Sequence, residues 1–542
     1  MLSLIDNFLN RITMYRLVLY YLVFLLAAAV VFGFFGILPY SPLTIIFSTL
    51  VLVFVSWVTN ELFSRVFGAQ PNVESVYITA LILALIIDPV APSEIAKISF
   101  LIWAAVWAMA SKYILAGNRK HLFNPAAFAV ALTAITINQS ASWWAGGNLP
   151  LMLFIVLGGF LVARKVQRFH LIFAFLAAGL AMTVLTGDLN NPFSTLEKAL
   201  LHAPFFFFAF VMLTEPLTTP PTRALRIIYG AVVGLLFAPA IHLGTIYSTP
   251  ELSLLAGNIF SYLVSHKKKY VLSLSKKELA GEGIYDFVFH AGDKVQFRAG
   301  QYMEWTLGQD KPDSRGNRRC FTIASSPTED EIRIGVKFYD NPSTFKSKML
   351  SLEPGDKIVM GQLAGDFTLP SNPGEKLAFL AGGIGVTPFR SMAKYLSDKN
   401  EKRDIVLLYS NKTLSEIAYK EVFDEAAAKT GMRTVYVLTS TGEIPAGINA
   451  RAGMINPAPF REASTQHKEL VRDLSTLQAR QRYIWEKCGI NAEMLKMEIP
   501  DYMERTFYVS GPHSMVAAME KALREIGIKR SRIKIDFFPG FA

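Results

Sequence analysis

The sequence predicts a multi-domain chain in which a polytopic α-helical membrane domain precedes an antiparallel β-barrel and a doubly wound α/β domain. Three observations support this fold class. Long apolar runs are confined to residues 1–269, alternation of apolar and polar residues begins at Tyr270, and a buried-strand pattern at 376–381 leads into a glycine-rich turn. At 542 residues the chain is also too long for one core. We expect domains at 1–269, 270–372 and 373–542.

The first domain is expected to cross the membrane about ten times. Its apolar runs approach the roughly 20 residues that an α-helix needs to span the hydrocarbon layer. The expected spans lie near 16–35, 43–62, 76–89, 98–115, 124–138, 150–163, 170–186, 199–214, 227–246 and 251–265.

Basic residues predict the orientation of these spans. Residues 1–269 contain 16 Lys and Arg, and with ten spans 14 of them fall in loops on one side. Lys97 and Lys198 are the two on the other side. Because cytoplasmic loops carry an excess of Lys and Arg, we expect both termini to be cytoplasmic and the protein to lie in the cell membrane.

Composition excludes several other classes. The net charge of +11 is mostly membrane-flanking, so nucleic-acid binding is not expected. Two cysteines cannot form a disulfide scaffold, a four-ligand zinc site or a thiolate-bound iron–sulfur cluster, and we expect no metal site.

One strand of the expected barrel carries Arg319-Cys320-Phe321-Thr322. This stretch resembles the flavin-binding motif of the ferredoxin-NADP⁺-reductase family, which reads Arg-x-aromatic-Ser/Thr. The resemblance implies that these four residues bind FAD. Arg319 would hold the pyrophosphate, Phe321 would cover the isoalloxazine ring, and the Thr322 hydroxyl would reach the flavin N5.

A second segment resembles the phosphate-binding loop of the same family. It contains Val336 and Lys337, followed by Ser343 and Thr344. Ser343, Thr344 and nearby backbone N–H groups would contribute to holding the pyrophosphate. Asn341-Pro342 replaces the glycine usual at this loop.

A glycine-rich turn opens the third domain. The residues that matter are Gly382, Gly383, Gly385, Thr387 and Pro388. A strand, a glycine-rich turn and a helix N-terminus together form an anion site for a dinucleotide pyrophosphate. The Gly-Gly-x-Gly-x-Thr-Pro pattern resembles the reductase variant of this turn and implies NAD(P)H binding.

Near the C-terminus, Ser510-Gly511-Pro512 stands where the family commonly has Cys-Gly-Pro. The resemblance places Ser510 beside the site of hydride transfer and implies that Thr322 acts there through the flavin N5. Phe538 would be a flavin-side aromatic residue or a core residue. Residues 450–486 are expected to be an insertion, with a solvated loop or a partner contact as the default interpretation.

In the membrane domain, His121–Phe128 and Phe210–Thr218 resemble the RnfD/NqrB subunits of ion-translocating electron-transport complexes. Proline and polar side chains at membrane depth indicate a site, so Asn124 and Glu215 are expected to line a cofactor pocket. The loop after Asn124 lacks the Asp-x-x-Thr-x-Ala-Thr pattern of covalent FMN attachment. Any FMN or riboflavin there would be noncovalent.

These observations predict a membrane flavoprotein that moves electrons from cytoplasmic NAD(P)H through FAD into or across the membrane. The acceptor would be a membrane or extracytoplasmic flavoprotein, or a quinone if the protein is an NAD(P)H:quinone reductase. A haem-based reductase would need paired histidines, whereas His121, His170, His202 and His242 are single per span. A transporter role is disfavoured by the expectation of almost no buried acid or base. NADH and NADPH are both compatible with Lys412.

Overall fold

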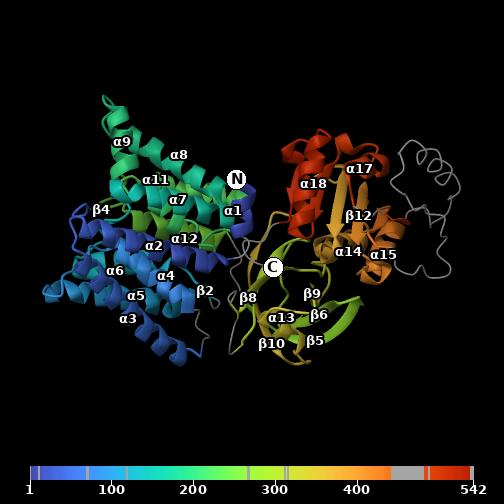
Figure 1. The fold of residues 1–542 in the computed structure, drawn as a ribbon, viewed down its shortest axis with the longest axis horizontal. Coiled ribbons are helices and arrows are strands. Elements are labelled where there is room, and N and C mark those ends of the chain that lie inside the picture. Colours follow the sequence, from blue (N-terminus) through green and yellow to red (C-terminus); the bar gives the residue numbers. More distant parts are fainter. Residues whose placement is uncertain are drawn as a thin grey trace. The chain divides into compact units, whose positions relative to one another are not determined.

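The computed structural model describes residues 2–9, 12–68, 73–117, 120–264, 269–309, 313, 316–440, 481–485 and 489–536. It separates into two compact units, Met1–Lys269 and Tyr270–Phe538 (Figure 1).

The first unit is built almost entirely from helices. They are α1 (Leu2–Leu9), α2 (Met14–Phe34), α3 (Pro42–Val66), α4 (Val73–Ile86), α5 (Ile95–Ile114), α6 (Pro125–Ile137), α7 (Leu149–Val166), α8 (Phe169–Thr186), α9 (Pro192–His202), α10 (Phe205–Phe207), the π-helix η1 (Phe208–Met212), α11 (Arg223–Phe237) and α12 (Pro250–Leu263). Each predicted apolar run therefore contains helix.

Fewer helices are long enough to cross a membrane than the sequence predicts. Among the described residues, five helices are long and apolar enough to cross a membrane, namely α2, α3, α5, α7 and α8. A sixth is added if α9 and the segment Phe205–Met212, which meet at a 59° bend, count as one span. Helix α6 has 13 residues, or about 20 Å, against about 30 Å of hydrocarbon. Ten full spans are thus not confirmed.

The first unit contains an internal repeat. A two-stranded hairpin, β1 (Ala116–Gly117) with β2 (Lys120–His121), precedes α6, and a second one, β3 (His242–Leu243) with β4 (Ile246–Tyr247), precedes α12. The same backbone hydrogen bond closes both hairpins, from Leu122 N–H to Leu115 C=O at 3.0 Å and from Ser248 N–H to Ile241 C=O at 2.8 Å.

The helices on either side follow the same repeat. A polar N-cap and a proline start both α6 and α12, and an acid–proline pair follows both α4 (Asp88-Pro89) and η1 (Glu215-Pro216). Helices α2–α6 therefore correspond to α7–α12. Corresponding helices also meet, because α2 packs on α7 and α6 packs on α12.

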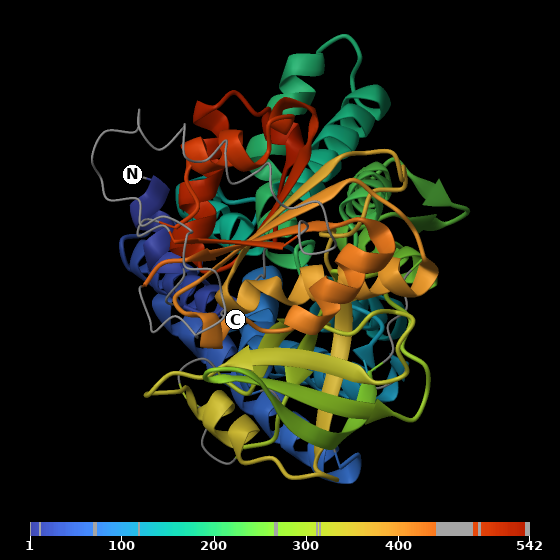
Figure 2. The ribbon, with the colours of Figure 1, turned by 90° about the vertical axis from the view of Figure 1, so that its right-hand side faces the viewer.

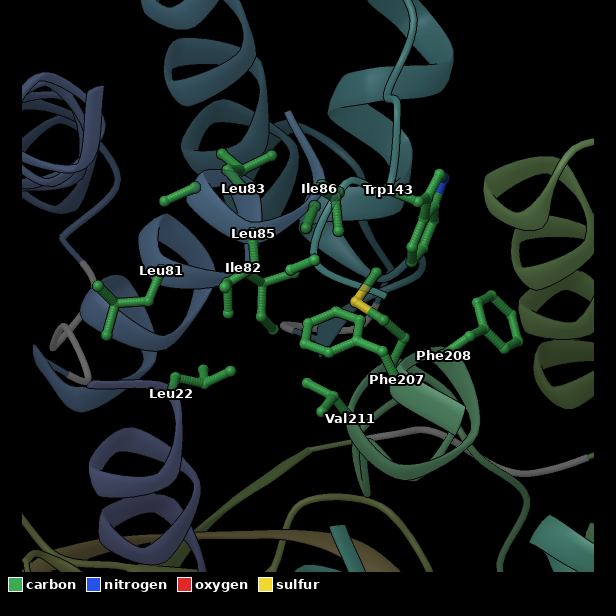
Figure 3. Packing of buried hydrophobic residues seen from close by; sticks show 14 of the residues in the cluster. Leu22, Leu81, Ile82, Leu83, Leu85, Ile86, Trp143, Phe207, Phe208 and Val211 are labelled. Atoms are coloured by element: carbon green, nitrogen blue, oxygen red, sulfur yellow. The ribbon is translucent and has the colours of Figure 1, made fainter. Parts of the chain in front are cut away.

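Aromatic side chains fill the centre of this unit. Figure 3 shows the Trp143 ring facing Phe207 and Phe208, and the ring centroids lie 6.5 and 5.8 Å apart. Trp143 has a φ of +56°, and its backbone N–H donates to Ile86 C=O at 2.8 Å. The loop that carries Trp143 therefore supplies donors to the last turn of α4.

The second unit begins with a six-stranded antiparallel sheet in the order β8-β7-β10-β5-β6-β9 (Figure 2). Its core contains Phe287, Phe289 and Trp305. Ala324 N–H donates to Arg333 C=O at 2.8 Å, which links the chain after β8 to the edge strand β9. The elements are β5 (Tyr270–Gly281), β6 (Ile284–Ala291), β7 (Tyr302–Thr306), β8 (Arg318–Thr322), β9 (Ile332–Lys337), α13 (Thr344–Leu350) and β10 (Lys357–Ala364).

A six-stranded parallel sheet follows, in the order β14-β13-β12-β11-β15-β16. Helices α14 and α15 cover one face, and α17 and α18 cover the other (Figure 1), which confirms the predicted doubly wound sheet. The elements are β11 (Leu377–Gly382), α14 (Thr387–Lys399), β12 (Ile405–Asn411), α15 (Lys420–Thr430), β13 (Arg433–Leu438), β14 (Gln481–Trp485), α17 (Ala492–Glu498), β15 (Thr506–Ser510), α18 (His513–Glu525) and β16 (Ile533–Ile535).

The segment 450–486 that we expected to be inserted includes β14, which pairs with β13 as a strand of this sheet. Apart from 481–485, that segment lies outside the described residues. The chain continues from β11 to β12 on one side and later places β15 on the other side of β11. In such sheets ligands bind beyond the carboxyl ends of the strands at this reversal.

Candidate functional site

Two glycine-containing turns meet at the carboxyl ends of β11 and β15. These strands are neighbours, with Ala381 paired to Ser510. A Cβ atom added to Gly385 would lie 2.5 Å from both the N and the Cα of Gly511. Gly385 is therefore glycine because the two turns touch.

Gly383 is the position of this turn with open space where a side chain would project. Its φ is +50°, and a Cβ placed on it would meet nothing within 4 Å. Thr387 donates its hydroxyl to Ile384 C=O at 3.2 Å, and Pro388 lies in the first turn of α14. Gly382 and Pro512 contribute to the contact between the turns, since a Cβ on Gly382 would lie 3.2 Å from the Pro512 ring.

The contact between the turns gives a prediction for Gly385→Val. The branched side chain would collide with the Gly511 backbone, so we expect a lower melting temperature and loss of flavin reduction by NAD(P)H together. Gly374→Val is a control, because the nearest atom to its added Cβ, Asn372 Oδ1, is 3.4 Å away. A Gly385→Val protein with unchanged melting temperature would contradict the packing argument.

Thr322 and Ser510 come together at a carboxylate that the sequence reasoning missed. Ser510 Oγ lies 3.1 Å from Asp536 Oδ2, and the Thr322 side chain also hydrogen-bonds to Asp536. Thr322 and Ser510 are 5% and 3% exposed. Asp536 is held by its backbone N–H, which donates to Val509 C=O at 3.0 Å. Strands β8 and β15 and the chain after β16 thus build one cluster.

Burial raises the pKa of Asp536 to about 7, although hydrogen bonds from Ser510 and Thr322 act in the opposite direction. A carboxyl group with a pKa near neutrality can both accept and release a proton under ordinary conditions. This cluster is therefore suited to moving a proton between Asp536 and the Thr322 hydroxyl.

Arg319 and Thr344, which were predicted to bind a pyrophosphate, already converge on one anionic group. Arg319 Nη2 lies 3.3 Å from Asp313 Oδ1, and Thr344 N–H donates to Asp313 Oδ2 at 3.3 Å. The Arg319 guanidinium also lies 5.1 Å from the centroid of the Phe345 ring. The two predicted segments therefore form one anion-binding position.

Several other predicted residues have structural partners. Phe321 and Val336 lie in the core of the antiparallel sheet, and Ser343 caps α13 by accepting from Lys346 N–H at 3.3 Å. Lys337 pairs with Glu416 at 2.9 Å. Burial raises the pKa of the Cys320 thiol well above its usual range. Phe538 lies outside the described residues.

In the first unit, Asn124 and Glu215 come together as predicted from their separate motifs. Asn124 Nδ2 donates to Glu215 Oε2 at 2.9 Å, and His121 Nε2 lies 3.3 Å from Glu215 Oε1. Asn124 also caps α6, because its Oδ1 accepts from Ala127 N–H at 3.1 Å. The carboxylate additionally accepts from the Thr218 hydroxyl at 3.2 Å. This polar cluster joins α6 to the loop after η1.

The expectation of almost no buried acid or base concerned the expected spans and is not contradicted: among the described residues Glu251 lies within a span (251–265), whereas Lys165 and Arg168 lie between the spans 150–163 and 170–186. Glu251, Lys165 and Arg168 are 3%, 5% and 6% exposed. Each has a polar partner: Trp143 Nε1 donates to Glu251 at 3.2 Å, Lys165 donates to Leu9 C=O at 2.8 Å, and Arg168 donates to Thr214 C=O at 3.3 Å. Hydropathy averages over a helix and so does not reveal such paired groups.

The second unit thus combines an antiparallel sheet with a doubly wound parallel sheet of the kind that binds dinucleotides, and a helical membrane unit precedes it in the chain. Residues 379–469 match the oxidoreductase NAD-binding domain, and residues 145–271 match the NQR2, RnfD, RnfE family. The chain therefore joins an NQR2/RnfD/RnfE-type region to an oxidoreductase NAD-binding domain. The second match includes Phe210–Thr218, and His121–Phe128 precedes it.

Curated relatives match about half of the chain. A flavohemoprotein of Bacillus subtilis is 26% identical over 49% of this chain and 58% of its own length. The glycine betaine monooxygenase reductase subunit of Chromohalobacter salexigens is 24% identical over 46% of this chain and 59% of its own. A ferredoxin NADP⁺ reductase structure from Neisseria gonorrhoeae, with bound FAD and NADP, aligns at 15% identity over 50% of this chain and 99% of that one, with a TM-score of 0.37.

Proposed function

We propose that the protein is a membrane NAD(P)H-dependent FAD oxidoreductase that passes electrons into or across the membrane. The observation that carries this proposal is the cluster of Thr322, Ser510 and Asp536 at the carboxyl edge of a doubly wound sheet. The match of residues 379–469 to an oxidoreductase NAD-binding domain supports it, as do relatives named as reductase subunits.

The residues present fit FAD and a nicotinamide nucleotide. Arg319 and the Thr344 N–H already share one carboxylate, so they can instead bind the FAD pyrophosphate. The open backbone at Gly383 can approach the nucleotide phosphates. Bound FAD would accept a hydride from NAD(P)H and release its electrons one at a time.

The chain's own side chains would position the reactants and move a proton. The Ser510 hydroxyl would orient the nicotinamide, and Thr322 would contact the flavin. Loss of electrons from a reduced flavin would also release a proton. Ionised Asp536 can accept that proton through the Thr322 hydroxyl. Phe538 would complete the site on the flavin side, as its place in the terminal segment implies.

The proposed route continues through the membrane unit, with Asn124 and Glu215 at the entry pocket for a noncovalent flavin or a partner flavoprotein. Both termini would be cytoplasmic, because 14 of 16 basic residues in 1–269 fall on one side with ten crossings. Five helices long enough to span, together with the NQR2/RnfD/RnfE match, support a membrane location.

Sealed inside-out vesicles test direction and route together. Added NADH or NADPH should reduce an acceptor trapped in the lumen, and right-side-out vesicles should show no such reduction. Glu215→Gln should stop lumenal reduction and leave FAD reduction intact, whereas Glu61→Gln, at a surface ion pair with Arg65, should change neither. Rapid reduction of added quinone without lumenal reduction would instead establish a quinone reductase.

A further inference from the structure

A buried carboxylate joins the antiparallel sheet to the parallel-sheet domain. Asp286, on β6, is 3% exposed. Its Oδ1 accepts from the Tyr419 hydroxyl at 2.9 Å, and its Oδ2 accepts from Arg333 Nη1 at 3.0 Å. Tyr419 immediately precedes α15, so this hydrogen bond connects the two sheets of the unit. A buried carboxylate with two donors strongly favours one arrangement of its partners.

Tyr419 occupies an unfavourable backbone conformation to make this bond. Its φ and ψ are +60° and +29°, in the left-handed region that is unfavourable for a residue other than glycine. Gly335 on β9 leaves the room that it needs. A Cβ on Gly335 would collide with the Tyr419 hydroxyl and approach Ile384 and Thr387 at 2.9 and 3.0 Å. The sheet therefore packs directly against the glycine-rich turn.

Helix α14 is hydrogen-bonded to the chain that directly follows the motif Arg319–Thr322. Arg390 donates to Ala324 C=O at 3.1 Å and to Glu329 Oε1 at 2.9 Å. Ser391 donates to Ser325 C=O at 2.6 Å. Ala324 and Ser325 follow Thr322 by only two and three residues, so these bonds tie the nucleotide turn to the strand that carries Thr322. Arg390 also lies 5.8 Å from the centroid of the Tyr419 ring.

We infer that Tyr419 is a positioning residue for hydride transfer, because its bond to Asp286 fixes the separation between Thr322 and the turn Gly382–Pro388. This inference rests on the proposed function. A displacement of about 1 Å between reacting groups can lower a rate by about 100-fold. The Tyr419 hydroxyl donates to Asp286, which is not a predicted cofactor-binding residue, so binding and transfer should respond differently to its loss.

The test uses the full-length, FAD-loaded protein and stopped-flow reduction by NADH and NADPH. In Tyr419→Phe, FAD content and the dissociation constant of the nucleotide should change less than about twofold. The limiting rate of flavin reduction at saturating nucleotide should fall by about tenfold or more. Tyr436→Phe is the matched control, because Tyr436 is a fully buried tyrosine of β13 in the same domain.

Asp286→Ala provides a second variant should Tyr419→Phe fold poorly. It removes the acceptor of the Tyr419 hydroxyl together with the partner of Arg333, so the limiting rate should fall at least as far. Adding Tyr419→Phe to Asp286→Ala should lower the limiting rate no further, since the acceptor of the Tyr419 hydroxyl is already absent. An unchanged limiting rate in folded Tyr419→Phe would overturn the inference, even with a lower melting temperature. Failure of NAD(P)H to reduce the unaltered protein would instead overturn the proposed function.

Discussion

Asp536→Asn should lower turnover of NAD(P)H with a one-electron acceptor by about 100-fold at pH 7, a loss typical of a missing general acid or base. Asn retains the size and polarity of the side chain but cannot accept a proton. In the unaltered protein, turnover should rise as the pH rises through about 7, because the pKa of Asp536 is raised to about 7 and the ionised form accepts the proton. The variant should lack this rise.

The stability of the same variant should change in the opposite direction. Because the pKa of Asp536 is raised in the fold, the native state holds this proton more tightly than the unfolded chain. Its contribution to stability is therefore present at acidic pH and is lost as the pH rises through about 7. Asp536→Asn should melt at a higher temperature than the unaltered protein at about pH 8, measured by circular dichroism. Slow turnover with a retained pH dependence would refute the assignment to Asp536.

Arg319→Ala should abolish FAD retention. Hydrogen bonds to charged groups contribute about 1.5–3 kcal/mol each, so losing a two-pronged contact to the pyrophosphate should weaken binding at least on the order of 100-fold. Absorbance should show a flavin-to-protein ratio near zero after gel filtration. Full occupancy in Arg319→Ala would remove the basis for the FAD site.

The neighbouring Arg318 provides the control for Arg319. Arg318 is on the same strand as Arg319 and pairs with Glu304 of β7 at 3.1 Å, and Arg318→Ala should retain FAD. Arg319 is 4% exposed, so its removal could also disturb the sheet. Recovery of NAD(P)H oxidation by Arg319→Ala in excess FAD would show that the fold survives and that affinity was lost.

The sequence was most informative about the soluble half, where local patterns coincide with the elements that they predict. The buried-strand pattern at 376–381 coincides with β11 (Leu377–Gly382), because buried parallel strands are short apolar runs. Span lengths were less predictable. The run at 227–246 ends as a helix at Phe237, since Pro239 and the β3–β4 hairpin follow within it.

Contacts between distant segments were only partly predictable. Asn124 and Glu215 were assigned to one pocket because each stands beside a proline within a recognisable motif; their side chains are hydrogen-bonded, and the cofactor pocket stays a prediction. Asp536 was overlooked because its role depends on Thr322 and Ser510, which reach it only in the folded chain. The sequence around Tyr419 does not predict its role, because a tyrosine with a left-handed backbone conformation before a helix cannot be distinguished in sequence from an ordinary core residue.

The repeat in the membrane unit implies how that unit could have originated. Helices α2 and α7 correspond and touch, and so do α6 and α12. In a symmetric pair of identical subunits, equivalent surfaces meet across the axis in this way. A gene for a single half, acting as a homodimer and later duplicated and fused, would leave this arrangement. The two acid–proline pairs of the repeat have different partners: Glu215 is bound by Asn124 and His121, whereas Asp88 is bound by the hydroxyls of Tyr40 and Ser142.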